Sequence, residues 1–176
     1  RHFSLASIPG MADHVISCYA FTKTYSMTGW RIGYLHAAEE RLAEINKAHI
    51  AFAICAPVVS QHAALAALEG SQECVGHFRR RYQSARDLMC ERLDRLAYVF
   101  SYVKPGGAYL MFPRVLIEDG RDSMQFGKQL LAQTQVSVTP GIAFGPTGEA
   151  HVRLSFCVPE AMINNAFDRM ETYFGF

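Results

Sequence analysis

The feature that most constrains the fold is a long amphipathic segment over residues 72–96, QECVGHFRRRYQSARDLMCERLDRL. Apolar side chains recur there every three or four residues, and charged side chains occupy the opposite side. The apolar positions are Phe78, Tyr82, Ala85, Met89, Leu93 and Leu96. This period predicts one helix of roughly seven turns with a single buried face. We expect a helix of that length to join two lobes, so the chain divides into residues 1–71 and 72–176.

Both lobes mix strands and helices. β-branched and aromatic runs predict strands, and apolar residues at helical spacing, bounded by proline and glycine, predict helices. In the first lobe the expected strands are 14–21 and 30–37, and the expected helices are 39–53 and 57–70. In the second lobe we expect two strands within 98–115 around a Pro-Gly-Gly turn, a helix at 122–133 capped by Asp122 or Ser123, strands at 136–145 and 151–158, and a helix at 160–174. The fold class is therefore α/β, with an α+β layer in the second lobe.

Composition argues against several classes of function. Seventeen lysines and arginines balance sixteen aspartates and glutamates, for a formal net charge of +1, so no basic surface for nucleic acid or a membrane is expected. No apolar run reaches the roughly 18 residues of a membrane span. The five cysteines form no CxxC pair, and the seven histidines show no metal-ligand spacing. We therefore expect no metal, and mostly buried, reduced thiols in a cytoplasmic protein.

The stretch AFTKTYSMTGWRIGY, residues 20–34, holds two isolated cations, Lys23 and Arg31. Aromatic and apolar neighbours of Lys23 predict an amine in an apolar pocket, where the neutral form is favoured. A neutral amine condenses with aldehydes to a Schiff base. Arg31 lies in an expected strand, where its guanidinium suits a phosphate and a strand-edge salt bridge is the alternative. Gly29 and Gly33 are expected to allow close backbone approach.

This stretch resembles the lysine signature of the class I and II aminotransferases, fold-type-I enzymes that use pyridoxal 5′-phosphate. The positions that match in order and spacing are Lys23, Met27, Gly29, Arg31 and Gly33. Three further segments resemble the family: SLASIPGM before the lysine, PGGAYLMFP, and VSVTPGIAFGPTGEAHVRLSF, which is similar to the segment with the substrate arginine. The resemblance extends over the whole chain.

The resemblance implies roles for three residues. Lys23 corresponds to the lysine that binds pyridoxal phosphate as a Schiff base and later moves a proton, and Arg31 to a ligand of the cofactor phosphate. Arg153 corresponds to the arginine that binds the substrate α-carboxylate, with a salt bridge to a surface acid as the alternative. Residues 1–71 would then be the C-terminal part of a cofactor-binding large domain, and 72–176 the connecting helix and small domain. A homodimer is implied for the full-length protein.

Two departures from the family pattern stand out. Ala20 occupies the position where many members have a phosphate-binding serine. In the family, a glycine-rich phosphate turn, an aspartate for the pyridine nitrogen, a tyrosine and an asparagine precede the lysine by more residues than this chain has before Lys23. We therefore expect a C-terminal portion of an aminotransferase, inactive by itself, whose large-domain sheet lacks partner strands and leaves an apolar face and an open edge.

The leading interpretation is an aminotransferase that moves an amino group between an α-amino acid and a 2-oxo acid. Another fold-type-I enzyme, such as a carbon–sulfur β-lyase or one similar to aminocyclopropane carboxylate synthase, is consistent with the same lysine and arginine. A third interpretation is the aminotransferase-like sensor domain of a transcription regulator, which requires an upstream DNA-binding domain. The sequence leaves side-chain specificity open.

Overall fold

In the computed structural model, which describes residues 3–175, the chain divides into two compact units, Arg1–His77 and Phe78–Phe176. We call them the N-terminal unit and the C-terminal unit. The division falls inside helix α4 (Glu73–Arg95), six residues after the predicted one. The long helix predicted at 72–96 is confirmed to within one residue at each end.

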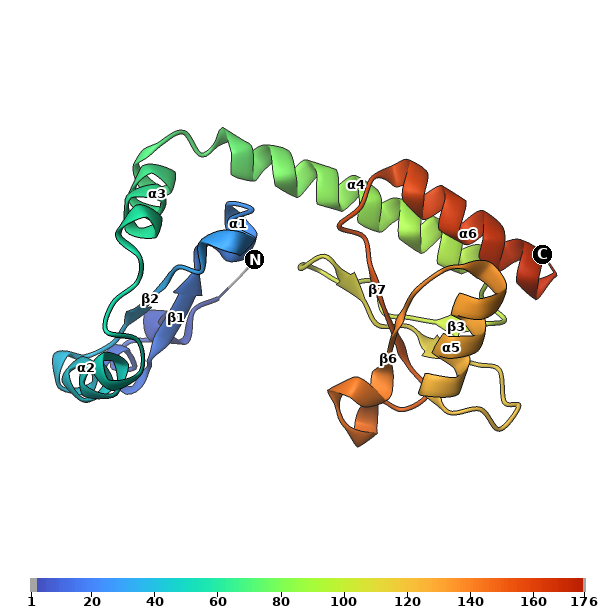
Figure 1. Ribbon diagram of the computed structural model, residues 1–176, viewed down its shortest axis with the longest axis horizontal. Helices are drawn as coiled ribbons and strands as arrows, with labels where there is room; N and C mark the ends of the chain where they lie inside the picture. Colours follow the sequence, from blue (N-terminus) through green and yellow to red (C-terminus); the bar gives the residue numbers. More distant parts are fainter. Residues whose placement is uncertain (1–2, 176) are drawn as a thin grey trace. The chain divides into compact units, whose positions relative to one another are not determined.

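The N-terminal unit consists of an antiparallel strand pair, two longer helices and short helical turns (Figure 1). Its elements are η1 (Leu5–Ser7), η2 (Ala12–His14), β1 (Ser17–Ala20), α1 (Phe21–Thr24), η3 (Thr28–Trp30), β2 (Gly33–His36), α2 (Glu39–Ala53) and α3 (Val58–Glu69). Helix α2 has the predicted bounds. Helix α3 begins directly after Pro57 and ends before Gly70, whose N–H bonds to the Ala66 carbonyl at 2.9 Å. Both helices confirm the sequence prediction.

The two predicted strands of this unit are shorter than expected. Residues 12–14 form a 3₁₀ turn, and Phe21 begins the single helical turn α1, so the strand predicted at 14–21 is wrong at both ends. Likewise, η3 takes up the first part of the strand predicted at 30–37. The pairing of β1 with β2 ends at the pair Ala20 and Gly33. Directly after this pair, the Phe21 N–H donates to the Ile32 carbonyl at 3.3 Å.

The N-terminal unit buries little apolar surface. Its core cluster consists of Phe21, Met27 and Ala64, with a few half-buried neighbours. Helix α2 buries no residue, and every residue of β2 is exposed, including Tyr34 and Leu35. A two-stranded sheet cannot bury its apolar faces by itself. Within residues 3–175 no further strand pairs with the outer edges of β1 and β2. The expected open apolar face is therefore present.

The C-terminal unit places three helices around short antiparallel strands (Figure 1). After α4 its elements are β3 (Phe100–Ser101), β4 (Leu110–Met111), β5 (Arg114–Val115), α5 (Ser123–Thr134), β6 (Thr139–Pro140), η4 (Gly141–Phe144), η5 (Pro146–Gly148), β7 (Val152–Ser155) and α6 (Glu160–Phe174). Strand β7 lies between β4 and β6, and β3 pairs with β5. Asp122 caps α5 through a capping box with Gln125, and α6 has the predicted bounds.

Two strand predictions in this unit are wrong. Residues 98–115 form three two-residue strands, and the Pro-Gly-Gly segment lies in the loop between β3 and β4, which do not pair with each other. The strand predicted at 136–145 is reduced to Thr139–Pro140, because η4 follows at once. There the Gly141 N–H bonds to the His151 carbonyl at 2.8 Å, and the chain turns away from the sheet.

The C-terminal unit has a large core formed by α4, α5, α6 and the strands. Fully buried side chains include Leu93 in the last turn of α4, Leu96 directly after it, Leu130 in α5, and Phe167 and Met170 in α6. Apolar residues at helical spacing therefore converge from three helices onto one cluster, as the long amphipathic pattern predicted. Burial of this kind supplies most of a small unit's stability.

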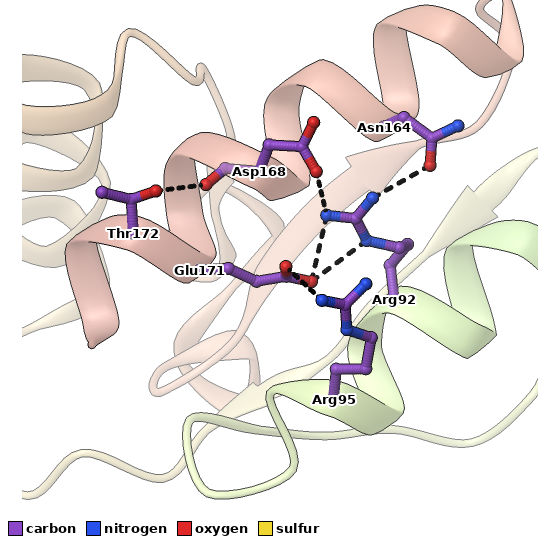
Figure 2. Close-up of polar contacts among 6 residues, drawn as sticks. All are labelled: Arg92, Arg95, Asn164, Asp168, Glu171 and Thr172. Carbon is purple, nitrogen blue, oxygen red and sulfur yellow. Dashed lines mark hydrogen bonds and ion pairs between the residues drawn. The ribbon is translucent and has the colours of Figure 1, made fainter. Parts of the chain in front are cut away.

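A buried cation joins α4 to α6 inside this unit (Figure 2). The Arg92 guanidinium donates to Glu171 at 3.0 Å, to Asp168 at 2.6 Å and to Asn164 at 3.0 Å. Glu171 is also paired with Arg95 at 2.8 Å. The side chains of Arg92 and Glu171 are only 7% and 8% exposed. Because each buried charge has a partner, the arrangement avoids the cost of an isolated ion.

Candidate active site

Lys23 lies on α1, directly after strand β1. Phe21, two residues earlier, is buried, and Lys23 is exposed. Residues two apart on a helix point about 200° apart, so burying Phe21 turns Lys23 away from the core. The prediction of an apolar pocket around Lys23 is therefore wrong for this chain: the apolar neighbours Phe21 and Met27 pack on Ala64 instead.

Helix α3 holds the lysine segment in place. Ala64 of α3 contributes to the core that Phe21 and Met27 form. The buried Ser60 hydroxyl donates to the Trp30 carbonyl at 2.8 Å. The segment between the two cations is thus fixed at its apolar side chains and at its backbone, while Lys23 stays accessible.

Arg31 lies at the end of η3 in a left-handed backbone conformation, with φ of 50°. The predicted strand position for this residue is wrong. One N–H of its guanidinium donates to the Thr28 carbonyl at 3.1 Å, and the side chain is exposed. Ser26 in the same segment also has a positive φ, 56°. Two non-glycine residues in this conformation cost about 1–2 kcal/mol each, and such strain is concentrated at functional sites.

The two glycines of the motif differ in their surroundings. A Cβ on Gly33 would lie 2.5 Å from the Tyr19 carbonyl oxygen, so the predicted close backbone approach is confirmed there. A Cβ on Gly29 would meet no described atom within 4 Å. Only Gly33 is therefore required by the packing of the described residues, since a side chain there would push β2 away from β1.

Arg153 belongs to the C-terminal unit, on the central strand β7. It is half-buried, and its Nη2 donates to the Thr139 hydroxyl at 3.2 Å. Its Cζ lies 4.9 Å from the centroid of the Phe144 ring. Among the residues that the structure describes, Arg153 pairs with no carboxylate. The alternative of a salt bridge to a surface acid is therefore not observed.

The sequence did not single out Thr139, Phe144 or Ser60. Thr139 is the cross-strand partner of Arg153, and no local pattern announces that register. Ser60 supports the lysine segment from a helix thirty residues further along. Phe144 does lie in the segment that resembles the family, nine residues before Arg153. Its presence in the same segment as the arginine was the sequence signal that could have been used.

Other classes of site are not found within the described residues. Residues 3–175 contain no cluster of three or more histidine, cysteine or acidic side chains that could hold a metal. In the same range, none of the helices combines the length and apolar character that a membrane crossing needs. All five cysteines are free, but only Cys90 is buried. The prediction of mostly buried thiols is therefore wrong.

The family model for aminotransferase class I and II matches residues 3–170. The chain belongs to this family. It is 36% identical to aromatic-amino-acid aminotransferase 2 of Thermococcus litoralis and 36% identical to an aspartate aminotransferase of Pyrococcus abyssi. Each alignment covers 97% of this chain and 44% of the relative. The crystal structure of an aromatic aminotransferase from Pyrococcus horikoshii superposes with a TM-score of 0.92 at 34% identity, covering 99% of this chain and 46% of the other.

The chain thus spans less than half the length of these aminotransferases. It matches the C-terminal part of the fold-type-I enzymes, which confirms the predicted fold class. Enzymes of the class I and II aminotransferase family are generally dependent on pyridoxal phosphate.

The residues around Lys23 fit that cofactor. Helix α1, which carries Lys23, contacts η3, and Arg31 directly follows η3 in the chain. An accessible primary amine suits an aldehyde, and a guanidinium with uncommitted N–H groups suits a phosphate. The donor chemistry at this corner of the N-terminal unit therefore matches a phosphorylated aldehyde, although Ala20 offers no hydroxyl.

Proposed function

We propose that the protein containing this chain is a pyridoxal-phosphate-dependent aminotransferase that moves an amino group between an α-amino acid and a 2-oxo acid. The observation that carries the proposal is Lys23, an accessible amine on α1, which contacts the turn η3 that Arg31 follows. The chain belongs to this family from residue 3 to residue 170. No observation favours a β-lyase or a sensor domain over this function.

We assign one role to each of the three site residues. Arg31 binds the cofactor phosphate with the guanidinium N–H groups that Thr28 does not use. Arg153 binds the substrate α-carboxylate, for which its planar fork is suited. When bound, pyridoxal phosphate supplies the electron-accepting ring that stabilises charge at the substrate α-carbon. The Lys23 amine removes the α-proton as a general base and returns a proton as a general acid.

We further propose that residues 1–71 belong to the cofactor-binding large domain and 72–176 to the connecting helix and small domain. A homodimer in the cytoplasm completes this proposal. The exposed apolar side chains of β1 and β2, such as Tyr19, Tyr34 and Leu35, support the view that other polypeptide covers this unit in the whole protein. The absence of disulfides among the five cysteines agrees with a reducing compartment.

The test is Lys23→Ala in the whole protein, with Lys47→Ala as the matched control. Lys47 is an exposed lysine of α2 that pairs with Glu44 at 2.6 Å. We expect Lys23→Ala to remove the visible absorbance of lysine-bound pyridoxal phosphate and nearly all amino-group transfer, while Lys47→Ala retains both. Transfer at the wild-type rate in Lys23→Ala would refute the assignment. Release of pyruvate and ammonia, in place of the amine form of the cofactor, would indicate a β-lyase instead.

A further inference from the structure

The guanidinium of Arg153 rests on an aromatic ring. The Phe144 ring centroid lies 4.9 Å from Cζ, within the range of a cation–π contact. The Phe112 ring packs edge-on against Phe144 at 5.7 Å and an interplanar angle of 84°. Phe112 in turn stacks on the His151 ring at 5.0 Å and 6°. The ring under the arginine is therefore itself held from the side.

The backbone that presents Phe144 is also fixed. Phe144 ends η4, and the Gly145 that follows has φ of 108°, a conformation that favours glycine. At the other end of η4, the Ile142 N–H donates to the buried Ser123 hydroxyl at 3.2 Å. Gly141 and Gly148 approach so closely that a Cβ on either would overlap the other's carbonyl. These contacts restrict the conformation of η4 and therefore hold the Phe144 ring beside the Arg153 guanidinium.

The remaining hydrogen-bonding capacity of Arg153 is available to a ligand. Its Nη2 donates to Thr139, and this is its only hydrogen bond to any described residue. A guanidinium has five N–H donors in a rigid fork, which can bind a carboxylate through two parallel bonds. An arginine that is held in one orientation loses less side-chain entropy on binding than a mobile one.

We propose that Phe144 and Thr139 are positioning residues that orient Arg153 before a carboxylate binds. The Phe144 face sets the plane of the guanidinium, and the Thr139 hydroxyl sets its rotation within that plane. This inference rests on the proposed role of Arg153 in carboxylate binding and adds the residues through which that role is achieved. Neither positioning residue touches the substrate in this assignment, so their effect is on affinity rather than on chemistry.

The experiment is a titration of the ¹⁵N-labelled 176-residue chain with propanoate. It is followed at the Nε–H resonance of Arg153 and, in every variant including Arg153→Ala, at the backbone amide resonances of β7. The ring under the guanidinium is expected to move the Nε–H resonance upfield in the wild type, and Phe144→Leu is expected to remove that shift. Loss of a cation–π contact is expected to raise the dissociation constant for propanoate roughly two- to fivefold. Phe144→Tyr keeps the ring and is expected to restore both the shift and the affinity. Phe52→Leu, at a phenylalanine that is 92% exposed on α2, is the control and should change neither.

The outcomes separate this inference from the proposed function. If Arg153→Ala abolishes binding and Phe144→Leu binds as the wild type does, the positioning role is wrong and the carboxylate role stands. If Arg153→Ala binds propanoate as tightly as the wild type, or the wild type shows no saturable binding, the carboxylate role and the inference both fail. A Phe144→Leu spectrum that changes throughout the C-terminal unit would indicate lost structure, and the Phe144→Tyr variant then decides. A wild-type shift and affinity in Phe144→Tyr support the positioning role of Phe144. Weakened binding in a folded Phe144→Tyr variant overturns that role.

Discussion

Replacing Arg92 by methionine is expected to destabilise the C-terminal unit strongly. The substitution keeps the apolar stem of the side chain and removes the charge that pairs with Glu171 at 3.0 Å. Glu171 then remains as a carboxylate that is 8% exposed, with Arg95 as its partner at 2.8 Å. Breaking a buried ion pair by removing one partner costs about 3–5 kcal/mol. Because Arg95 stays, we expect the lower end of that range, about 3 kcal/mol.

The other partners of Arg92 add little to this figure. The Asp168 side chain is 68% exposed, so its pair with Arg92 contributes under about 1 kcal/mol. Asn164 is half-buried, and water can replace the lost bond to its side-chain oxygen. A loss of about 3 kcal/mol is a large fraction of the roughly 5–15 kcal/mol that stabilises an ordinary domain.

The assay is urea unfolding followed by far-ultraviolet circular dichroism at neutral pH. With an m-value of about 1.5 kcal/mol/M, the expected loss lowers the unfolding midpoint by about 2 M. Arg79→Met is the control, because Arg79 is exposed on the same helix and a surface change costs less than about 0.5 kcal/mol. The double variant Arg92→Met, Glu171→Leu is expected to recover most of the loss, since an apolar pair of similar volume replaces a buried ion pair at little cost.

Two results would refute this reasoning. A midpoint for Arg92→Met within 0.5 M of the wild type would mean that the network contributes no net stability (the threshold is about 0.75 kcal/mol at the same m-value). A double variant that is less stable than Arg92→Met would mean that Glu171 is stabilised by Arg95 and its surroundings without Arg92. The first result would leave the apolar contacts to hold α4 and α6 together, and the second would assign the polar contribution to the Arg95–Glu171 pair.

Two further predictions concern Glu149 and Arg31. Backbone N–H groups of Ala150 and Ser123 hold the pKa of Glu149 below its ordinary value, so its carboxylate stabilises the fold above the unfolded pKa of about 4.3 and this contribution is lost as the pH falls through the lower folded pKa. Glu149→Gln should therefore lower the urea midpoint relative to the wild type at pH 7, and the difference should disappear in acid. Glu118→Gln, at an exposed site, should leave the midpoint unchanged at both pH values. Arg31→Gly and Ser26→Gly both relieve a left-handed residue and should stabilise the chain by up to about 1 kcal/mol. Only Arg31→Gly should weaken pyridoxal phosphate binding by the whole protein, and equal cofactor affinities in the two variants would contradict the phosphate role.

The helices could be predicted from the sequence because their signals are local. Periodic apolar residues, Pro57, Gly70 and the Asp122 cap define their ends within the segment itself. The short strands could not, because a two-residue strand exists only through its partner. Thr139 is a strand residue because it faces Arg153, fourteen residues away, and nothing near Thr139 in the sequence specifies that pairing.

The candidate site divides in the same way. The lysine motif pointed to Lys23 and Arg31 by order and spacing, and the resemblance of the later segment pointed to Arg153. The chemical roles of all three stay predictions. Their surroundings were not accessible from the sequence, because they depend on which way a turn rotates a side chain. The aromatic content around Lys23 predicted a pocket, yet the helical start at Phe21 directs this ring onto Ala64 of α3 and leaves the amine exposed.

The contact between Gly141 and Gly148 makes the connection from β6 to β7 intolerant of changes in length. Surface connections usually accept insertions and deletions without harm to the fold. Here two backbones meet where no side chain fits, and β6 adds only two residues to the sheet. One inserted residue would shift the register, take Thr139 away from Arg153 and turn the alternate side chains to the opposite face. Among natural variants of this segment, substitutions are therefore expected at its exposed positions, and gaps are not.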